Sequence, residues 1–130
     1  MTQLPDEAKA LLDRPEFATV ATLEPSGQPH LSVVWVGREG DDILFSTVRG
    51  RRKTDNLERD PRTTVLVYPK DNPYSYLEVR GEAELVDDPE AAYIDEMALK
   101  YTGSPRYQWG KPGDARVTVR VRPQKVVWHG

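Results

Sequence analysis

The 130-residue sequence contains no cysteine and only two histidines, His30 and His129. The lack of cysteine excludes disulfide bonds, thiolate nucleophiles, zinc ribbons and cysteine-ligated iron–sulfur clusters. Neither histidine lies in a metal-ligand spacing such as H-E-x-x-H, so we expect no metal site. A Ser-His-Asp triad has little support, because no G-x-S-x-G segment accompanies the scattered serines. We therefore name no catalytic side chain and expect that, in an enzyme, a bound cofactor would carry the reaction.

Long apolar runs and an excess of positive charge are also absent. No apolar run is longer than Val33 to Val36, which excludes a membrane-spanning helix. Residues 1–7 lack the basic and apolar regions of a signal peptide, so we expect a cytoplasmic protein. Eighteen Lys and Arg residues against 21 Asp and Glu residues give a net charge of -3, opposite to that of a general nucleic-acid-binding protein. We expect neither nucleic acid nor a membrane as a partner.

The pattern of apolar residues predicts a mostly β protein. Strands are expected over 17–23, 30–36, 43–47, 63–68, 74–86, 116–122 and 125–128, with helices from Pro5, over 50–60, and from Asp88 to near Gly103. Turns at 24–28 and 37–42 would join the first three strands into a meander. Gly81 indicates a bulge, and Val117, Val119 and Val121 should point inward. Six or seven short strands with hairpin-length connections favour a small antiparallel barrel, formed by residues 1–130 as one domain.

A basic cluster, Arg49-Gly-Arg-Arg-Lys53, stands out in this acidic chain. It precedes a predicted helix, where cations oppose the positive end of the helix dipole and a bound anion would reverse that penalty. The hydroxyls of Ser46 and Thr47 could donate two further hydrogen bonds. The cluster thus indicates a phosphate or carboxylate site. The alternative is a solvated surface that is partly neutralised by Asp55, Glu58 and Asp60.

Aromatic residues near turns and strand ends give a second signal. They are Trp35, Phe45, Tyr68, Tyr74, Tyr76, Tyr107, Trp109 and Trp128. Such residues could enclose a flat ring system, or they could pack in the core or at a dimer interface. The two interpretations coincide at a ligand site between subunits.

Four segments have a characteristic order and spacing: Phe17–Leu23, Gly27–Trp35, Phe45–Thr47 with Gly50–Arg62, and Asn72–Gly81. They resemble the split β-barrel flavin/deazaflavin family, also called the pyridoxamine 5'-phosphate oxidase-like superfamily. Within it, the sequence is most similar to the small F-420-dependent enzymes of actinobacteria. The resemblance extends over nearly the whole chain.

The resemblance implies a mainly β fold with peripheral helices, a six-stranded antiparallel split β-barrel of the FMN-binding type. It also implies a homodimer with a flavin-type cofactor in a groove between the subunits. The cofactor phosphate would be held by the segment with Ser46, Thr47, Arg51, Arg52 and Lys53. The ring would lie along the strand with Ser32, Val33, Val34 and Trp35. The other subunit would contribute the stretch with Asn72, Tyr74 and Tyr76.

The activity implied by the resemblance is hydride transfer between the deazaflavin coenzyme F-420 and a small organic substrate. FMN is the alternative cofactor, since both molecules carry a phosphate. A non-catalytic dimer that binds a flavin- or heme-related ligand is another alternative, and a dimeric interaction module with an empty groove is a third.

Overall fold

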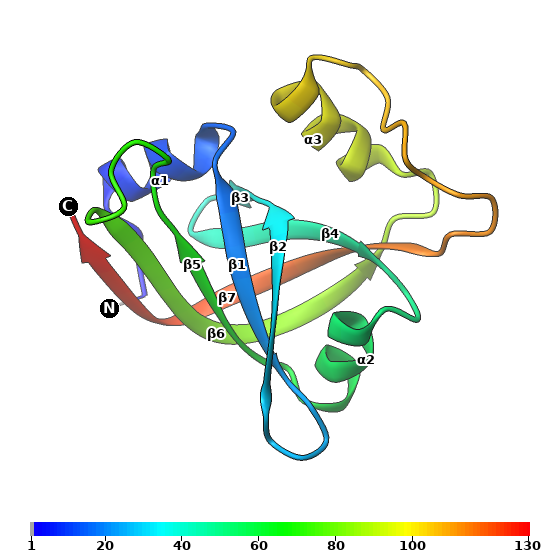
Figure 1. The fold of residues 1–130 in the computed structure, drawn as a ribbon, viewed down its shortest axis with the longest axis horizontal. Helices are drawn as coiled ribbons and strands as arrows, with labels where there is room; N and C mark the ends of the chain where they lie inside the picture. The colour runs from blue at the N-terminus through cyan, green and yellow to red at the C-terminus, as the bar shows by residue number, and fades with distance from the viewer. Residues whose placement is uncertain (1) are drawn as a thin grey trace.

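The computed structural model describes residues 2–130, which form a curled antiparallel sheet with three helices (Figure 1). The elements are α1 Asp6–Asp13, β1 Phe17–Leu23, β2 Pro29–Trp35, β3 Gly37–Glu39, β4 Asp42–Val48, α2 Arg52–Arg59, β5 Arg62–Val67, β6 Tyr76–Asp87, α3 Ala92–Thr102 and β7 Arg116–His129. The expected mainly β fold of the split-barrel type is thereby confirmed. The structure has seven strands over these residues, because the short β3 joins the sheet.

The strand order explains why the sheet curls. It runs β2-β1-β5-β6-β7-β4-β3, and all neighbouring strands are antiparallel. The two edge strands, β2 and β3, are consecutive in the chain, with only Val36 between them. The edges must therefore lie close together, and the sheet bends into a half-barrel around Val36, which is fully buried.

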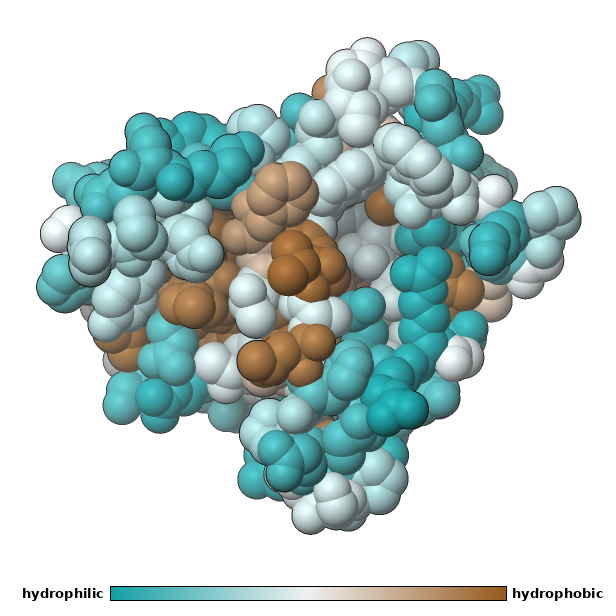
Figure 2. All heavy atoms as spheres, viewed as in Figure 1, coloured by the Kyte–Doolittle hydropathy of each residue, from teal (hydrophilic) through white to brown (hydrophobic). Residues whose placement is uncertain are grey.

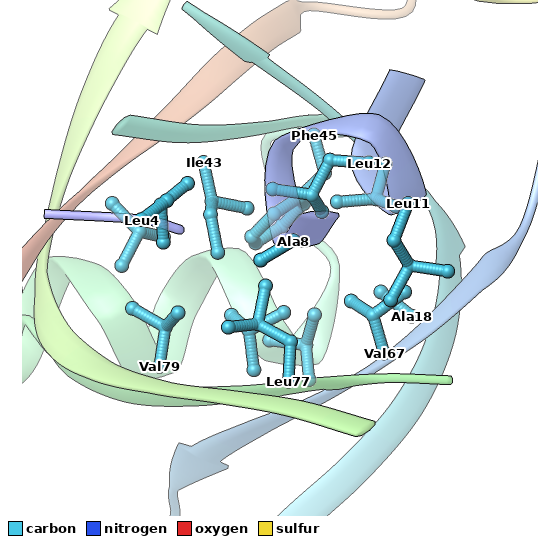
Figure 3. Close-up of a cluster of buried hydrophobic side chains, with 14 of the residues drawn as sticks. Leu4, Ala8, Leu11, Leu12, Ala18, Ile43, Phe45, Val67, Leu77 and Val79 are labelled. Carbon is cyan, nitrogen blue, oxygen red and sulfur yellow. The ribbon is translucent and has the colours of Figure 1, made fainter. Parts of the chain in front are cut away.

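A single cluster of aliphatic side chains and Phe45 fills the interior of this half-barrel (Figure 3). Helix α1 covers one end and inserts Ala8, Leu11 and Leu12, which are at most 1% exposed. The helix expected from Pro5 carries this apolar stripe because Leu4, Ala8, Leu11 and Leu12 follow the spacing of one helix face. Burying side chains of this kind contributes about 1.5–3 kcal/mol each for the larger ones, so the cluster stabilises the barrel against which the site is built.

The two longest strands confirm a second local pattern. Val117, Val119 and Val121 of β7 are all fully buried, as their alternation predicts. The register between β6 and β7 shifts at Arg80/Gly81, so Gly81 does mark a bulge. A Cβ atom on Gly81 would lie 2.2 Å from the carbonyl oxygen of Arg122, which leaves room only for glycine.

Other expectations were wrong. Residues 37–42 do not form a simple turn, because Gly37–Glu39 pairs with β4 as strand β3. The three-strand meander is absent, since β4 pairs with β7 and β3 instead of β2. Residues 125–128 are not a separate strand but the end of β7, which continues past the bulge. The pairing of β4 with β7 joins distant parts of the chain, which local patterns do not specify.

Helix α3 begins later than the sequence indicates, at Ala92 rather than next to Asp88. Ala91, the last of the three residues between Asp88 and the helix, adopts a left-handed conformation with φ of 58°. The Asp88 carboxylate still caps the helix, because it accepts hydrogen bonds from the backbone N–H groups of Ala92 and Tyr93 at 2.9 and 3.0 Å. The helix ends at Gly103 with φ of 78°, as expected.

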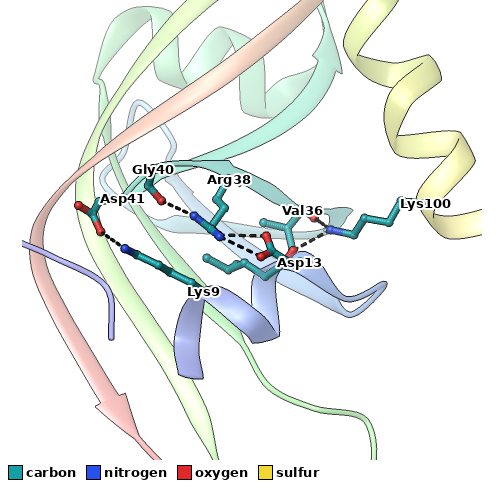
Figure 4. Close-up of polar contacts among 8 residues, drawn as sticks. Lys9, Asp13, Val36, Arg38, Gly40, Asp41 and Lys100 are labelled. Carbon is teal, nitrogen blue, oxygen red and sulfur yellow. Dashed lines mark hydrogen bonds and ion pairs between the residues drawn. The ribbon is translucent and has the colours of Figure 1, made fainter. Parts of the chain in front are cut away.

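Polar contacts fasten helices α1 and α3 to the β2–β3 corner (Figure 4). Lys100 of α3 donates hydrogen bonds to the carbonyl oxygens of Leu12 and Val36, each at 2.7 Å. Arg38 pairs with Asp13 at the end of α1, with the nearest N–O distance 2.9 Å. These contacts fix the corner where the two sheet edges meet. None of the helices in residues 2–130 is long and apolar enough to cross a membrane.

Candidate functional site

A groove of about 410 Å³ lies between β2 on one side and α3, the connection 103–115 and the start of α2 on the other. Figure 2 shows a hollow beside the apolar atoms that gather over β1 and β2. The groove is lined by Phe17, Val33, Val34, Trp35, Ser46, Arg51, Lys53, Ile94, Met97, Tyr107, Trp109 and Arg116. No Asp or Glu lines it, although acids outnumber bases in the chain. Its size is within the usual range for small-molecule sites.

Two members of the basic cluster face the groove. Arg51 precedes the first turn of α2, and Lys53 lies within that turn, where its side chain is half-buried. Burial lowers the pKa of Lys53, and the nearby charge of Arg51 lowers it further. The helix start carries no side-chain cap. Both cations thus lie in the groove without a compensating acid, an arrangement that an anion would stabilise.

The other two members of the cluster are neutralised elsewhere. Arg49 pairs with Glu58 at 2.6 Å and with Asp87 at 2.8 Å. Arg52 pairs with Glu24 of the β1–β2 hairpin at 2.9 Å, and this hydrogen bond lowers the pKa of Glu24. The surface interpretation of the cluster therefore applies to these two arginines. The structure separates the cluster into two residues that line the groove and two that are paired outside it.

A third cation in the groove, Arg116, was not expected from the sequence. It begins β7, is only 7% exposed, and donates a hydrogen bond from Nη1 to the Ser46 Oγ at 3.2 Å. Its guanidinium carbon lies 4.6 Å from the centre of the Tyr107 ring. Within residues 2–130 it makes no ion pair with an acid. A buried guanidinium without a counter-ion is unusual, since buried charges are normally paired.

Aromatic rings form another part of the lining. Trp35 lies parallel to Tyr101, with ring centres 4.9 Å apart, and it meets Tyr107 and Trp109 edge-on at 5.8 and 6.2 Å. The Trp109 side chain is 60% exposed. Aromatic faces bind planar ligands by stacking. The groove thus combines a surface suited to a flat ring with cations suited to an acidic group.

Two expected site residues lie near the groove without lining it. Ser32 is on the same strand as Val33, and its buried Oγ has no hydrogen-bond partner within the described chain. Thr47 is 1% exposed, and its hydroxyl contacts that of Thr54 at 3.3 Å. Thr47 therefore fastens α2 to β4, whereas Ser32 retains an unused hydrogen-bonding group.

The expected residues between β5 and β6 are remote from the groove of their own chain. Asn72 and Tyr74 are exposed in the connection, and the Tyr76 ring stacks on His129 with centres 5.4 Å apart. This region lies near α1 and the C-terminus (Figure 1). Of the twelve site residues named from the sequence, the groove brings together Val33, Val34, Trp35, Ser46, Arg51 and Lys53.

Sequence reasoning missed Arg116 and assigned no role to α3 in the site. In the sequence, Arg116 is simply the first residue of an alternating strand. Ile94 and Met97 have the spacing of an ordinary apolar stripe on a helix. Tyr107 and Trp109 can be found from the sequence, because they belong to the aromatic residues near turns and strand ends that could enclose a flat ring system. For metals, no group of three or more His, Asp or Glu side chains in residues 2–130 is arranged to hold an ion.

Comparison with known proteins agrees with this geometry. A family model described as pyridoxamine 5'-phosphate oxidase matches residues 4–129. The chain is similar to a solved F420 reductase at 32% identity and a TM-score of 0.83, with 95% of this chain and 98% of that chain covered. It is also similar to a conserved hypothetical protein from Mycobacterium tuberculosis, at 27% identity and a TM-score of 0.76, covering 96% and 84% of the two chains.

A heme binding protein from Mycobacterium smegmatis shares the fold at 23% identity and a TM-score of 0.72, with 95% of this chain and 52% of that chain covered. The curled sheet, the groove beside its open edge and a family match over nearly all of the sequence are mutually consistent. The chain therefore belongs to the pyridoxamine 5'-phosphate oxidase family and has its flavin-binding split-barrel fold.

Proposed function

We propose that this protein is an F-420-dependent oxidoreductase that transfers a hydride between the deazaflavin and a small organic substrate. The observation that carries the proposal is the groove itself, in which cations without acidic partners and an aromatic wall share one cavity. The 32% identity to an F420 reductase over 95% of the chain supports F-420 over other ligands. FMN is the alternative, since it also joins a planar ring to a phosphate.

The residues present fit such a cofactor. Lys53 and Arg51 would hold its phosphate, because both line the groove and neither makes an ion pair within residues 2–130. The unpartnered Ser32 Oγ would gain a hydrogen bond from a polar ligand that extends along β2. Val33, Val34 and Trp35 would lie along the ring. When bound, F-420 supplies two-electron hydride chemistry.

The protein's own part in the reaction would be binding, orientation and exclusion of water. Trp35 is held in position by its stacking on Tyr101, so it offers the ring a fixed surface. Tyr107 and Trp109 lie against it from the 103–115 connection and would shield the groove from solvent. No side chain is required as a nucleophile in this scheme.

Purified protein should be titrated with F-420, FMN and heme, following F-420 fluorescence and the absorbance of the other two. We expect saturable binding of F-420 that is tighter than binding of either competitor, followed by oxidation of reduced F-420 with a suitable organic acceptor. Protein isolated with FMN, or tighter binding of FMN, would favour the FMN alternative. Preferential binding of heme with no hydride transfer would favour the non-catalytic alternative.

We also propose that the working form is a homodimer. Phe17, Leu31 and Val33 are apolar and 45%, 63% and 68% exposed on neighbouring positions of β1 and β2, where Figure 2 shows apolar atoms together. Exposed apolar patches commonly mark protein interfaces. A second copy on this face would cover the patch, and Asn72, Tyr74 and Tyr76 of that copy would complete the groove.

Sedimentation of the cofactor-loaded protein tests the dimer, since the chain has a mass of 14.8 kDa and the dimer twice that. Leu31→Glu should shift the protein to monomer, because it places a charge in the patch without altering the groove lining. Leu99→Glu is the matched control, since Leu99 is 56% exposed on α3, outside the patch. A monomeric wild-type protein with bound cofactor would contradict a shared site.

A further inference from the structure

The groove holds a positive charge that the chain does not compensate. Arg51, Lys53 and Arg116 line it, no Asp or Glu lines it, and none of the three makes an ion pair within residues 2–130. Elsewhere Arg49, Arg52 and seven other basic side chains are paired with acids. The basic side chains outside the groove that form no ion pair are exposed or half-buried, whereas Arg116 is buried.

Arg116 is the most informative of the three cations. Arg51 is exposed and can be solvated, whereas Arg116 is only 7% exposed, so water can hydrate its charge only in part. The structure nevertheless fixes its position. Its side chain bonds Ser46 at 3.2 Å and lies 4.6 Å from the Tyr107 ring centre, and its backbone oxygen accepts a hydrogen bond from Asp88 at 2.9 Å. The guanidinium is therefore fixed in position, and an anion that binds in the groove could serve as its counter-ion.

We infer that Arg116 is a third anion-binding residue of the groove, and that it acts with Arg51 and Lys53 to select ligands with at least two negative charges. The chemical class is a phosphate monoester, or a phosphate accompanied by a carboxylate. Arginine suits this role because its planar guanidinium can donate two parallel hydrogen bonds to either group. The inference rests on the proposed function, which places the acidic part of the cofactor in this groove. It adds to that proposal the number of negative charges that the ligand must carry.

Two small probes separate charge from shape. Phenyl phosphate, a monoester, carries nearly two negative charges at about pH 8, whereas diphenyl phosphate, a diester, carries one. We expect calorimetric titration of the wild-type protein to show tighter binding of phenyl phosphate. Arg116→Gln should weaken phenyl phosphate binding by roughly 10- to 100-fold and remove most of the preference over the diester. Arg116→Lys, which keeps the charge, should recover part of the loss.

Arg122→Gln is the matched control, because it removes the same charge from the same strand at an exposed position paired with Glu84. It should leave both affinities within about twofold. The thermal midpoint of the ligand-free protein distinguishes binding from a structural role. Since the Arg116 charge lacks a counter-ion, Arg116→Gln should not lower this midpoint much, whereas a structural arginine would cause a large drop.

The outcomes also separate this inference from the proposed function. If Arg116→Gln binds F-420 or FMN as tightly as the wild type, the inference is overturned and the oxidoreductase proposal remains. If the wild type binds phenyl phosphate through Arg116 but neither cofactor, the anion site remains and the proposed function fails. Equal affinity of the wild type for the monoester and the diester would refute the charge selection. The same conclusion would follow if Arg116→Lys bound phenyl phosphate no more tightly than Arg116→Gln.

Discussion

The rings of Trp35 and Tyr101 lie nearly parallel, 9° apart, and Tyr101 also fixes the backbone beside Trp35. Its hydroxyl accepts a hydrogen bond from the Val36 N–H at 2.9 Å and donates to the Glu16 carbonyl oxygen. One side chain of α3 therefore holds the start of β1, the end of β2 and one wall of the groove together. Burial raises the pKa of Tyr101 to about 12, so this hydroxyl stays protonated at neutral pH.

Removing that hydroxyl should destabilise the protein. In Tyr101→Phe the buried backbone groups of Glu16 and Val36 lose a partner, and we expect a loss of about 1–3 kcal/mol in the free energy of unfolding. Tyr93→Phe is the control on the same helix, because the buried Tyr93 hydroxyl has no partner within the described chain. It should be neutral or stabilising. Denaturant titration of both variants checks this, and equal effects would contradict the assigned role of Tyr101.

The division of the basic cluster predicts different effects from adjacent residues. Lys53→Ala should weaken cofactor binding by about 1.5–3 kcal/mol, because it removes a charged hydrogen bond inside the groove. Arg52→Ala should change the affinity little, since Arg52 faces Glu24. Fluorescence titration with F-420 compares the two. A larger loss from Arg52→Ala than from Lys53→Ala would mean that the phosphate lies outside the groove.

Cofactor affinity should fall at alkaline pH. Burial and Arg51 lower the pKa of Lys53 in the free protein, while a bound anion favours the charged lysine. Binding is therefore strongest below the pKa of free Lys53 and weakens as the pH rises through it. Dissociation constants measured between about pH 7 and about pH 10 should show this decline. Lys53→Arg should abolish the decline over that range, because arginine stays charged; a decline that persists in Lys53→Arg points to another group.

Gly81 should tolerate no side chain. Gly81→Ala places a Cβ 2.2 Å from the Arg122 carbonyl oxygen, so the backbone must shift, and we expect a loss of roughly 1–3 kcal/mol or more. Gly110→Ala is a suitable control, because its nearest neighbour would be a Tyr107 ring carbon at an ordinary 3.7 Å. Thermal unfolding of both variants compares their stabilities. Equal midpoints for Gly81→Ala and Gly110→Ala would mean that the bulge rearranges at little cost, which contradicts the prediction.

Local features of the fold were predictable from the sequence, and long-range ones were not. The α1 stripe, the inward valines of β7 and the bulge at Gly81 each follow from spacing or residue type within a few positions. The pairing of β4 with β7 does not, because it joins residues about 70 positions apart and the apolar residues of both strands suit many partners. The local patterns favoured a small antiparallel barrel, and the family resemblance specified that it is of the split-barrel type.

The candidate site also combines features that local patterns predict with features that depend on long-range contacts. The basic cluster and the aromatic residues were visible as patterns, and the resemblance indicated β2 as one wall. Arg51 lines the groove, whereas Arg52 is paired with Glu24 outside it. This difference depends on the position of Glu24 in space, which the spacing of residues in the cluster does not reveal. Arg116 became a candidate only when its burial and its lack of an acid partner were known.

The position of β7 has a consequence for how the chain reaches its final form. Strand β7 lies between β6 and β4 in the sheet, so residues 42–48 have no neighbour on that side until residues 116–129 arrive. During synthesis residues 116–129 must leave the ribosome before β3 and β4 can join the rest. The N-terminal segments therefore wait with apolar surface uncovered, and the last step of assembly and the completion of the groove coincide.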